Sequence, residues 1–304
     1  MTDIVTVIRD LTRVLAFYSR RLELLRPLAD NEIADEPLTR GYLSGDSAEM
    51  AYRSIAPWYS LVEPLYAEIE ASMQKASFEE KTAVLSDPEI LELLPANHRI
   101  RAAYELDKEV QEAEHMLDET DPQKALSDII EHQSYWILTE PVLEALSGAK
   151  RVAVIGSGPL PLTAIAVAER TNAEVTCYER DTVAYDLGDK IIELSKARDK
   201  ITSLCESAVP GPDMAGFDAI LCAVLLGVSV EDEHHHTKKE LLTGFAQAMG
   251  SNGKVILRDP YQLGALFYPK AGIEEELSLQ SRRFDPDMKP GDPYRSSFLI
   301  LNAK

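Results

Sequence analysis

The sequence of 304 residues has few cysteines and no long apolar run. Its three cysteines, Cys177, Cys205 and Cys222, lack the spacing of a zinc or redox motif, and an odd number argues against a disulfide framework. Each lies in an apolar segment typical of a strand, so we expect all three to be small buried side chains. No apolar segment reaches the roughly 18 residues that a transmembrane helix needs, and the N-terminal segment lacks the features of a signal peptide. We therefore expect a cytoplasmic protein.

Basic residues are in the minority. The chain has 31 Lys and Arg against 51 Asp and Glu, which gives a formal net charge of -20. Such a charge repels nucleic acids and anionic membrane surfaces, so neither is an expected partner. It suits an enzyme that handles a small-molecule substrate, and a cationic one in particular. The sequence leaves open whether the protein forms a homodimer.

The first half of the chain lacks the alternation of apolar and polar residues that marks a strand. Apolar residues such as Ile8, Leu11 and Leu15 recur at helical spacing instead. Asp121 is a predicted N-cap, because Pro122 follows it at the first helical position. We expect a helical bundle domain over residues 1–147 that covers the substrate. Its predicted helices span residues 5–18, 49–73, 77–85, 88–94 and 97–117, with one more from residue 122.

The second half alternates short apolar segments with helical ones. This order favours right-handed crossovers and a parallel sheet covered on both faces. The segment 294–304 is a final predicted strand, at the edge of the sheet or inserted antiparallel. The fold class is therefore α/β, with an N-terminal all-helical domain followed by a Rossmann-like, class I methyltransferase-type domain over residues 148–304. The other predicted strands lie within residues 151–158, 173–181, 201–205, 217–227 and 254–260.

The stretch GSGPLPLT, residues 156–163, follows the first predicted strand. In an open α/β sheet this turn lies at the carboxyl edge, at the topological switch point. Gly156 and Gly158 would let the backbone turn tightly and approach a ligand closely. Glu179 lies about 20 residues further on, where a carboxylate can accept hydrogen bonds from a ribose diol, and Asp181 is the neighbouring candidate. The arrangement predicts a nucleotide-binding site.

The same turn lacks the third glycine of a dinucleotide-binding loop. A pyrophosphate needs that glycine so that it can lie against the helix N-terminus. The stretch from Leu160 to Leu162 is bulky and short of N–H donors, so S-adenosylmethionine, which has no pyrophosphate, is the expected cofactor and substrate. The expected cofactor-binding residues are Gly156, Ser157, Gly158, Pro159, Leu160, Thr163, Glu179, Asp181, Ser207, Ala223 and Val224.

Three collinear motifs resemble those of nicotianamine synthases and their bacterial opine-metallophore relatives. GSGPLPLTAIAVAER is similar to the family signature GSGP-[LM]-PLTS. FDAILCAVLLGVSVEDE is similar to YDVVFLAALVGM, and KVILRDPYQLGALFYP to L-x-x-R-S-A-H-G-A-R-x-F-L-Y-P. The resemblance covers roughly residues 151–270. It implies the same architecture of a helical domain joined to a methyltransferase-like domain.

The resemblance also implies an unusual reaction. Members of this family do not transfer the methyl group of S-adenosylmethionine. An amine attacks the γ-carbon of the 3-amino-3-carboxypropyl arm, and methylthioadenosine leaves. The protein must align the amine with the Cγ–S bond and shield the methyl group.

The chain departs from the family where the second substrate would bind. The family's P-Y-Y-x-N-Y stretch is replaced by LPANHRIRAAYELDKEVQEAE, and its S-A-H by Asp259, Pro260 and Tyr261. We favour intramolecular cyclisation to azetidine-2-carboxylate, as in the related azetidine-2-carboxylate synthases, because it needs no second substrate. Transfer to an external amine is the runner-up. An ordinary small-molecule methyltransferase and a non-catalytic S-adenosylmethionine-binding module are the remaining alternatives.

Either reaction needs a neutral amine, and hence a base or surroundings that lower the pKa of the amine. The resemblance places the family's catalytic glutamate near Glu112 and its active-site tyrosine near Tyr135, and the alignment allows a shift of one helical turn. Tyr104 and Tyr261 are the other catalytic candidates. Tyrosines around a sulfonium would also attract the cation. Tyr268 is expected to pack.

Three consecutive histidines, residues 234–236, attract attention as a metal site. Consecutive residues of a helix point in different directions, and no spaced set of carboxylates or cysteines accompanies these three. We interpret the segment as the polar start of a helix. The proposed chemistry needs no metal, so none is expected.

Overall fold

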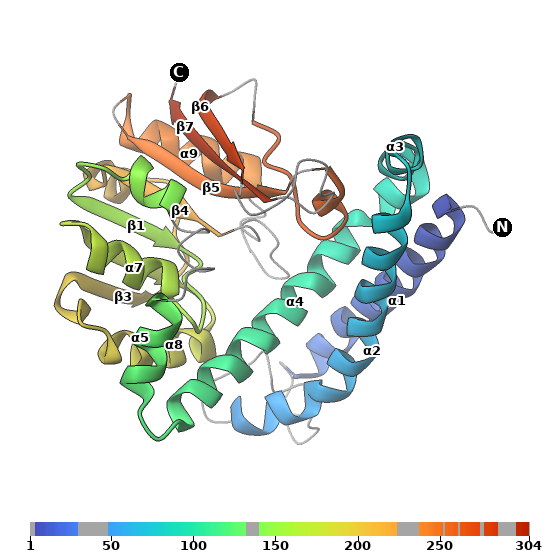
Figure 1. Cartoon of the computed structure of the whole chain (residues 1–304), viewed down its shortest axis with the longest axis horizontal. Helices are drawn as coiled ribbons and strands as arrows, with labels where there is room; N and C mark the ends of the chain where they lie inside the picture. Colours follow the sequence, from blue (N-terminus) through green and yellow to red (C-terminus); the bar gives the residue numbers. More distant parts are fainter. Residues whose placement is uncertain are drawn as a thin grey trace.

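The computed structural model describes residues 4–29, 48–131, 140–223, 237–251, 253–260, 262–273, 277–284 and 296–303. Helices make up the described parts of the N-terminal half, and a mixed sheet with flanking helices makes up the remainder (Figure 1). The predicted fold class is confirmed. No helix in these ranges is long and apolar enough to cross a membrane.

Helices α1 to α5 lie in the described residues before the first strand, and residues 140–145 are helical as well. α4 is the longest, with 31 residues, and it runs from α3 at one end to α5 and α8 at the other (Figure 1). The predicted N-cap of α5 is confirmed, because the Lys124 amide donates to Asp121 Oδ1 at 3.1 Å. The bounds are Ile4–Ala29 for α1, Ala48–Lys75 for α2, Phe78–Ser86 for α3, Pro88–Asp118 for α4 and Pro122–Glu131 for α5.

The prediction of two helices at 88–94 and 97–117 was wrong, because α4 continues through Pro95. A proline inside a helix has no N–H to donate and so frees one carbonyl, here that of Leu91. Leu91 is exposed, so water can reach that carbonyl. Ile90 and Ile100, on either side of the proline, are both buried in the helical core. Their packing holds the two halves of α4 as one helix.

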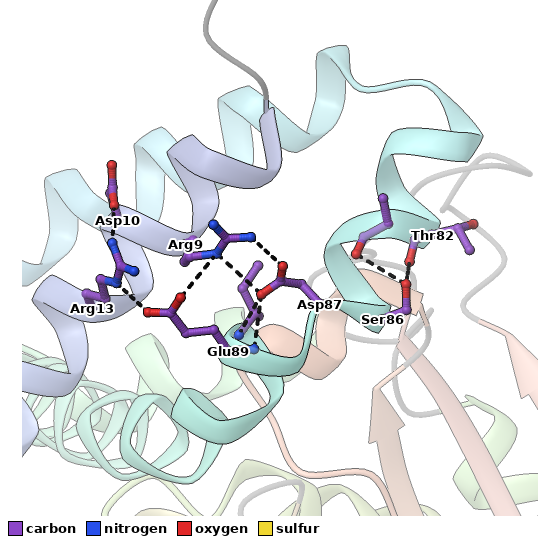
Figure 2. Close-up of polar contacts among 9 residues, drawn as sticks. Arg9, Asp10, Arg13, Thr82, Ser86, Asp87 and Glu89 are labelled. Carbon is purple, nitrogen blue, oxygen red and sulfur yellow. Dashed lines mark hydrogen bonds and ion pairs between the residues drawn. The ribbon is translucent and has the colours of Figure 1, made fainter.

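The start of α4 is tied to α1 by charged side chains (Figure 2). Asp87 caps the helix by accepting from the amides of Glu89 at 3.1 Å and Ile90 at 3.0 Å. Its other oxygen accepts from Arg9 Nη2 at 2.5 Å, and Arg13 Nε donates to Glu89 at 2.5 Å. The hydrogen bond from Arg9 lowers the pKa of Asp87. These contacts set the position of α4 relative to α1.

The sheet has seven strands in the order β3-β2-β1-β4-β5-β7-β6. The first five run parallel, and β7 is antiparallel to both β5 and β6. The strands are β1 (Arg151–Ile155), β2 (Glu174–Glu179), β3 (Ile201–Cys205), β4 (Ala219–Cys222), β5 (Lys254–Pro260), β6 (Leu277–Phe284) and β7 (Ser296–Ala303).

Helices cover both faces of this sheet. The helices of this half are α7 (Leu162–Arg170), α8 (Thr182–Leu194) and α9 (Lys238–Met249). Val152 and Val154 of β1 pack with α5, α7 and α8, whereas Ala153 and Ile155 pack with α9 on the opposite face. This alternation is what a strand buried on both faces requires.

Two features of the sheet differ from expectation. The last strand is not at the edge but lies antiparallel between β5 and β6, so the insertion alternative is confirmed. Strand β6 was not predicted, and its residues LSLQSRRF include five polar side chains. A strand with one neighbour can tolerate such a sequence.

One of the three cysteines is not buried. Cys177 and Cys222 are buried as expected, whereas Cys205 is exposed. Cys205 ends β3, which lies at the edge of the sheet and is only partly covered. The prediction for Cys205 was wrong because an apolar segment at an edge need not be covered.

Helix α4 connects the two halves. Its residues Val110 and Ala113 pack against Val183 and Leu187 of α8. Further along, His98 Nε2 lies 3.0 Å from the Ala265 carbonyl oxygen, in the segment that follows β5. Burial lowers the pKa of His98 to about 4, so its ring stays neutral at this contact. Helix α4 therefore lies along the carboxyl edge of the parallel strands, toward which β1 points in Figure 1.

Candidate active site

The glycine turn after β1 has the geometry of a close-approach loop. Gly156 and Gly158 have φ values of 71° and 70°, in the left-handed region that disfavours side chains. The amide of Gly156 donates to the Tyr178 carbonyl at 2.8 Å, which ties the turn to β2. A Cβ on Gly156 would lie 3.3 Å from the Ala223 Cβ, just after β4. The ends of β1, β2 and β4 meet at this turn.

Glu179 joins the turn at the end of β2. Its Oε2 accepts from the Gly158 amide at 2.9 Å, and its Oε1 accepts from the Asp181 amide at 3.0 Å. Burial raises the pKa of Glu179, although these amides oppose the rise. Each carboxylate oxygen retains a lone pair that can accept from a hydroxyl. Asp181 itself caps α8 by accepting from the Ala184 amide at 2.9 Å.

A glycine of α8 takes the packing role of the missing third glycine. A Cβ on Gly188 would lie 2.8 Å from the Gly158 carbonyl oxygen and 3.6 Å from Pro161 Cδ. Only a residue without a side chain lets α8 approach the turn so closely. Gly188 was not predicted, because it is a glycine in the middle of a helix and not one at a fixed spacing from the turn.

The two prolines leave the turn with few donors. Pro161 is the N-cap of α7 and makes no side-chain capping bond, and Pro159 has no N–H. The Leu162 amide donates to the Leu160 carbonyl at 2.7 Å, so it is already paired. Leu160 packs against the core on the α7 and α8 face of the sheet. This helix start is poorly suited to a pyrophosphate.

The remaining predicted cofactor residues lie around the turn with different exposures. The Ser157 hydroxyl hydrogen-bonds the buried Cys177 thiol, and burial raises the pKa of that thiol to about 12. Thr163 is half-buried in the first turn of α7. Ser207 is exposed beyond β3, and Val224 lies outside the described residues.

A second acid beside the turn was not among the predicted site residues. A Cβ on Gly158 would lie 2.9 Å from Oε2 of Glu109, on α4. Burial and the carboxylates of Glu105, Glu112 and Glu179 raise the pKa of Glu109 to about 7. A group with this pKa can accept a proton near neutral pH. The sequence could have pointed to Glu109, because it lies next to the apolar stripe of the helix that contains Val110 and Ala113.

The catalytic candidates named from the sequence are not all brought to the turn. Glu112 lies one helical turn beyond Glu109, and its side chain is 54% exposed and 3.8 Å from Lys108. Tyr104 packs edge to face against Tyr66, with ring centroids 5.4 Å apart. Tyr135, Tyr261 and the histidines at 234–236 lie outside the described residues.

Two helical turns before Glu109, four aromatic rings surround Arg101. The rings belong to Tyr66 of α2, Tyr104 of α4, and Phe267 and Tyr268 in the segment after β5. Arg101 also forms an ion pair with Glu105. Tyr268 was expected only to pack, but its hydroxyl accepts from Arg101 Nη2 at 2.9 Å and donates to Glu105 at 2.9 Å.

The described residues contain no group of three or more His, Cys, Asp or Glu that could hold a metal ion. The acids near the turn are Glu109 and Glu179, and an excess of carboxylate suits a cationic ligand. S-adenosylmethionine carries such a charge on its sulfonium. The residues at the carboxyl edge therefore fit this molecule.

Comparison with solved structures agrees with this fold. A Glu→Gln mutant of MtNAS in complex with S-adenosylmethionine is 18% identical, covers 83% of this chain and 97% of its own, and has a TM-score of 0.60. MtNAS in complex with MTA and tNA is 20% identical, covers 81% of this chain and 90% of its own, and has a TM-score of 0.59. At these identities the likeness shows the fold alone.

Comparison with protein families is more specific. A search of curated proteins found no match. The family model described as nicotianamine synthase protein, in contrast, matches residues 59–302, from α2 to β7. It includes the glycine turn, Glu109 and Glu179. The chain belongs to the nicotianamine synthase family, whose reaction is the S-adenosylmethionine-dependent transfer of an aminocarboxypropyl group.

Proposed function

We propose that this protein converts S-adenosylmethionine into azetidine-2-carboxylate and methylthioadenosine. The observation that carries the proposal is the Glu109 carboxyl beside Gly158, at the turn that would hold S-adenosylmethionine. Membership of the family supports attack on Cγ of the 3-amino-3-carboxypropyl arm. In the cyclisation, the α-amine of S-adenosylmethionine is itself the nucleophile, so no second substrate is needed.

The reaction balances with the groups of S-adenosylmethionine and one protein base. Glu109 takes one proton from the α-ammonium, which exposes the nitrogen lone pair. The nitrogen attacks Cγ and forms a four-membered ring as the Cγ–S bond breaks. Sulfur keeps the electron pair and leaves as the thioether of methylthioadenosine, and the ring nitrogen retains its two remaining protons. The proton on Glu109 returns to solvent.

The electrostatics around Glu109 suit this role. In the free protein its raised pKa makes it an effective proton acceptor near pH 7. Binding of a sulfonium and an ammonium nearby would favour the carboxylate form, because opposite charges stabilise each other. Glu179, anchored to the Gly158 amide, is placed to accept from the ribose hydroxyls.

The stretch that departs from the family supports cyclisation over transfer. Arg101, Tyr104 and Glu105 all lie in the sequence that replaces the family's aromatic, asparagine-rich stretch. Their side chains contact one another or the rings of Tyr66 and Tyr268. An external acceptor would have to displace this packing, whereas the α-amine of S-adenosylmethionine needs no such space.

Incubation with S-adenosylmethionine alone tests the proposal. We expect methylthioadenosine and azetidine-2-carboxylate in equal amounts, identified by mass spectrometry. Turnover only after an amine is added would indicate transfer to an external acceptor. S-adenosylhomocysteine would indicate a methyltransferase, and binding without any product would indicate a non-catalytic module.

A further inference from the structure

The cluster around Arg101 is a complete cation-binding cage. The guanidinium carbon lies 4.8 Å from the ring centroid of Tyr66, 5.1 Å from Tyr104, 5.3 Å from Tyr268 and 5.6 Å from Phe267. Aromatic faces attract a cation at such distances, and more strongly where water is excluded. The side chain of Arg101 is only 15% exposed. The cage thus has the aromatic lining that a foreign alkylammonium would require.

The cage also supplies a counter-charge and hydrogen bonds. Glu105 pairs with Arg101, and the Tyr268 hydroxyl links the two. Tyr66 is only 3% exposed, and among the residues that the structure describes its hydroxyl has no hydrogen-bond partner. An unpartnered hydroxyl at this depth is costly. Arg101 balances the charge of Glu105 but makes no hydrogen bond to the Tyr66 hydroxyl. An occupant of a different shape could make that hydrogen bond.

The wall of the cage that follows β5 is held in place independently of Arg101. Lys238 Nζ donates to the Pro269 carbonyl at 2.9 Å, and the Ala271 amide donates to Asp259 Oδ1 at 2.8 Å. Both anchors are buried. Tyr66 and Phe267 pack edge to face, with centroids 5.5 Å apart. The aromatic wall should therefore persist when Arg101 is shortened.

The cage lies on the same side of α4 as Glu109. Residues 101, 105 and 109 are spaced four apart and so follow one face of the helix. Arg101 contacts the segment after β5, and Glu109 contacts the turn after β1, both at the carboxyl edge of the sheet. The two positions are separated by about 12 Å along the helix axis.

We propose that Arg101 is an internal occupant of a cation site and that it excludes external amines from the reaction. An acceptor held in the cage by one ammonium group would reach toward Cγ with a second amine. Arg101 fills the cage first, so the α-amine of S-adenosylmethionine is the nucleophile that remains. This inference rests on the proposed function and assigns Arg101 as the residue that decides between cyclisation and transfer.

The test compares Arg101→Ala with Arg101→Met. Alanine empties the cage, whereas methionine removes the charge but leaves most of the side-chain volume. Each variant and the unaltered protein are incubated with S-adenosylmethionine and α,ω-diaminoalkanes of increasing length, with monoamines of matched length as controls. Mass spectrometry measures azetidine-2-carboxylate and the diamine carrying an aminocarboxypropyl group.

We expect the ratio of diamine adduct to azetidine-2-carboxylate to rise at least about tenfold in Arg101→Ala, and only with the longer diamines. Guanidinium chloride should suppress the adduct by refilling the cage. The unaltered protein and Arg101→Met should form little adduct. A folded Arg101→Ala that cyclises but forms no adduct overturns the inference. So does a rise in KM for S-adenosylmethionine in both variants, which would assign Arg101 to substrate binding.

A binding measurement separates this inference from the proposed function. Diamines should raise the melting temperature of Arg101→Ala but not that of the unaltered protein, whether or not either releases methylthioadenosine. Failure of cyclisation together with this shift overturns the proposed function alone, and absence of the shift overturns the cage. Should Arg101→Ala fail to fold with Glu105 unpaired, the Arg101→Ala/Glu105→Gln variant provides the same space without the buried charge.

Discussion

Helix α4 presents two acids one turn apart that differ in their surroundings. Glu105 pairs with Arg101 inside a ring of aromatic side chains, whereas Glu109 faces the glycine turn and is destabilised as an anion by burial and by its neighbouring carboxylates. The residue type and the helix face are the same. The cation one turn before Glu105 pairs with that acid, whereas burial and repulsion raise the pKa of Glu109. The properties of the acids on α4 therefore depend on their distance from Arg101.

The largest expected effect comes from removing the base. Glu109→Gln preserves the shape of the side chain but cannot take a proton, so methylthioadenosine release should fall by about 100-fold or more. Glu112→Gln, on the exposed side, is the matched control and should retain most of the activity. Initial rates of methylthioadenosine release, measured for both variants and the unaltered protein, test this prediction. Equal losses in both variants would contradict the assignment of Glu109.

Stability should respond to the same substitution in the opposite direction. The pKa of Glu109 is about 7 in the folded protein against an ordinary value of 4.5, so the unfolded chain ionises first as the pH rises. Glu109 therefore destabilises the fold increasingly between these values and fully above pH 7. Glu109→Gln should raise the free energy of unfolding by about 3 kcal/mol at pH 8.5, with little change near pH 4.5. Denaturant titrations at both pH values measure this, and a pH-independent gain would contradict it.

The smallest expected effect lies in the cage. Tyr268→Phe removes the hydroxyl that links Arg101 to Glu105 but leaves the ring. The variant should lose about 1 kcal/mol of stability, measured by denaturant unfolding, with little change in methylthioadenosine release. A loss of activity as large as that of Glu109→Gln would mean that the cage takes part in the chemistry.

Features of the site with local signals could be predicted. The glycine turn, the acid at the end of β2 and the N-cap Asp121 each depend on a few neighbouring residues, and all three are found where the sequence placed them. The continuity of α4 through Pro95 could not be predicted, because it depends on packing against other helices. Gly188 was missed for the same reason.

The sequence by itself determined the alternation of strands and helices, the absence of a dinucleotide loop and the excess of acid, because these follow from local patterns and composition. Only the tertiary structure decided which of these acids has a raised pKa. Glu105, Glu109 and Glu112 cannot be distinguished from the sequence of the helix alone. They differ in burial, in neighbouring charges and in their contacts with distant segments. The cage around Arg101 likewise draws its walls from α2, α4 and the segment after β5. Side chains so distant in sequence meet only in the folded chain.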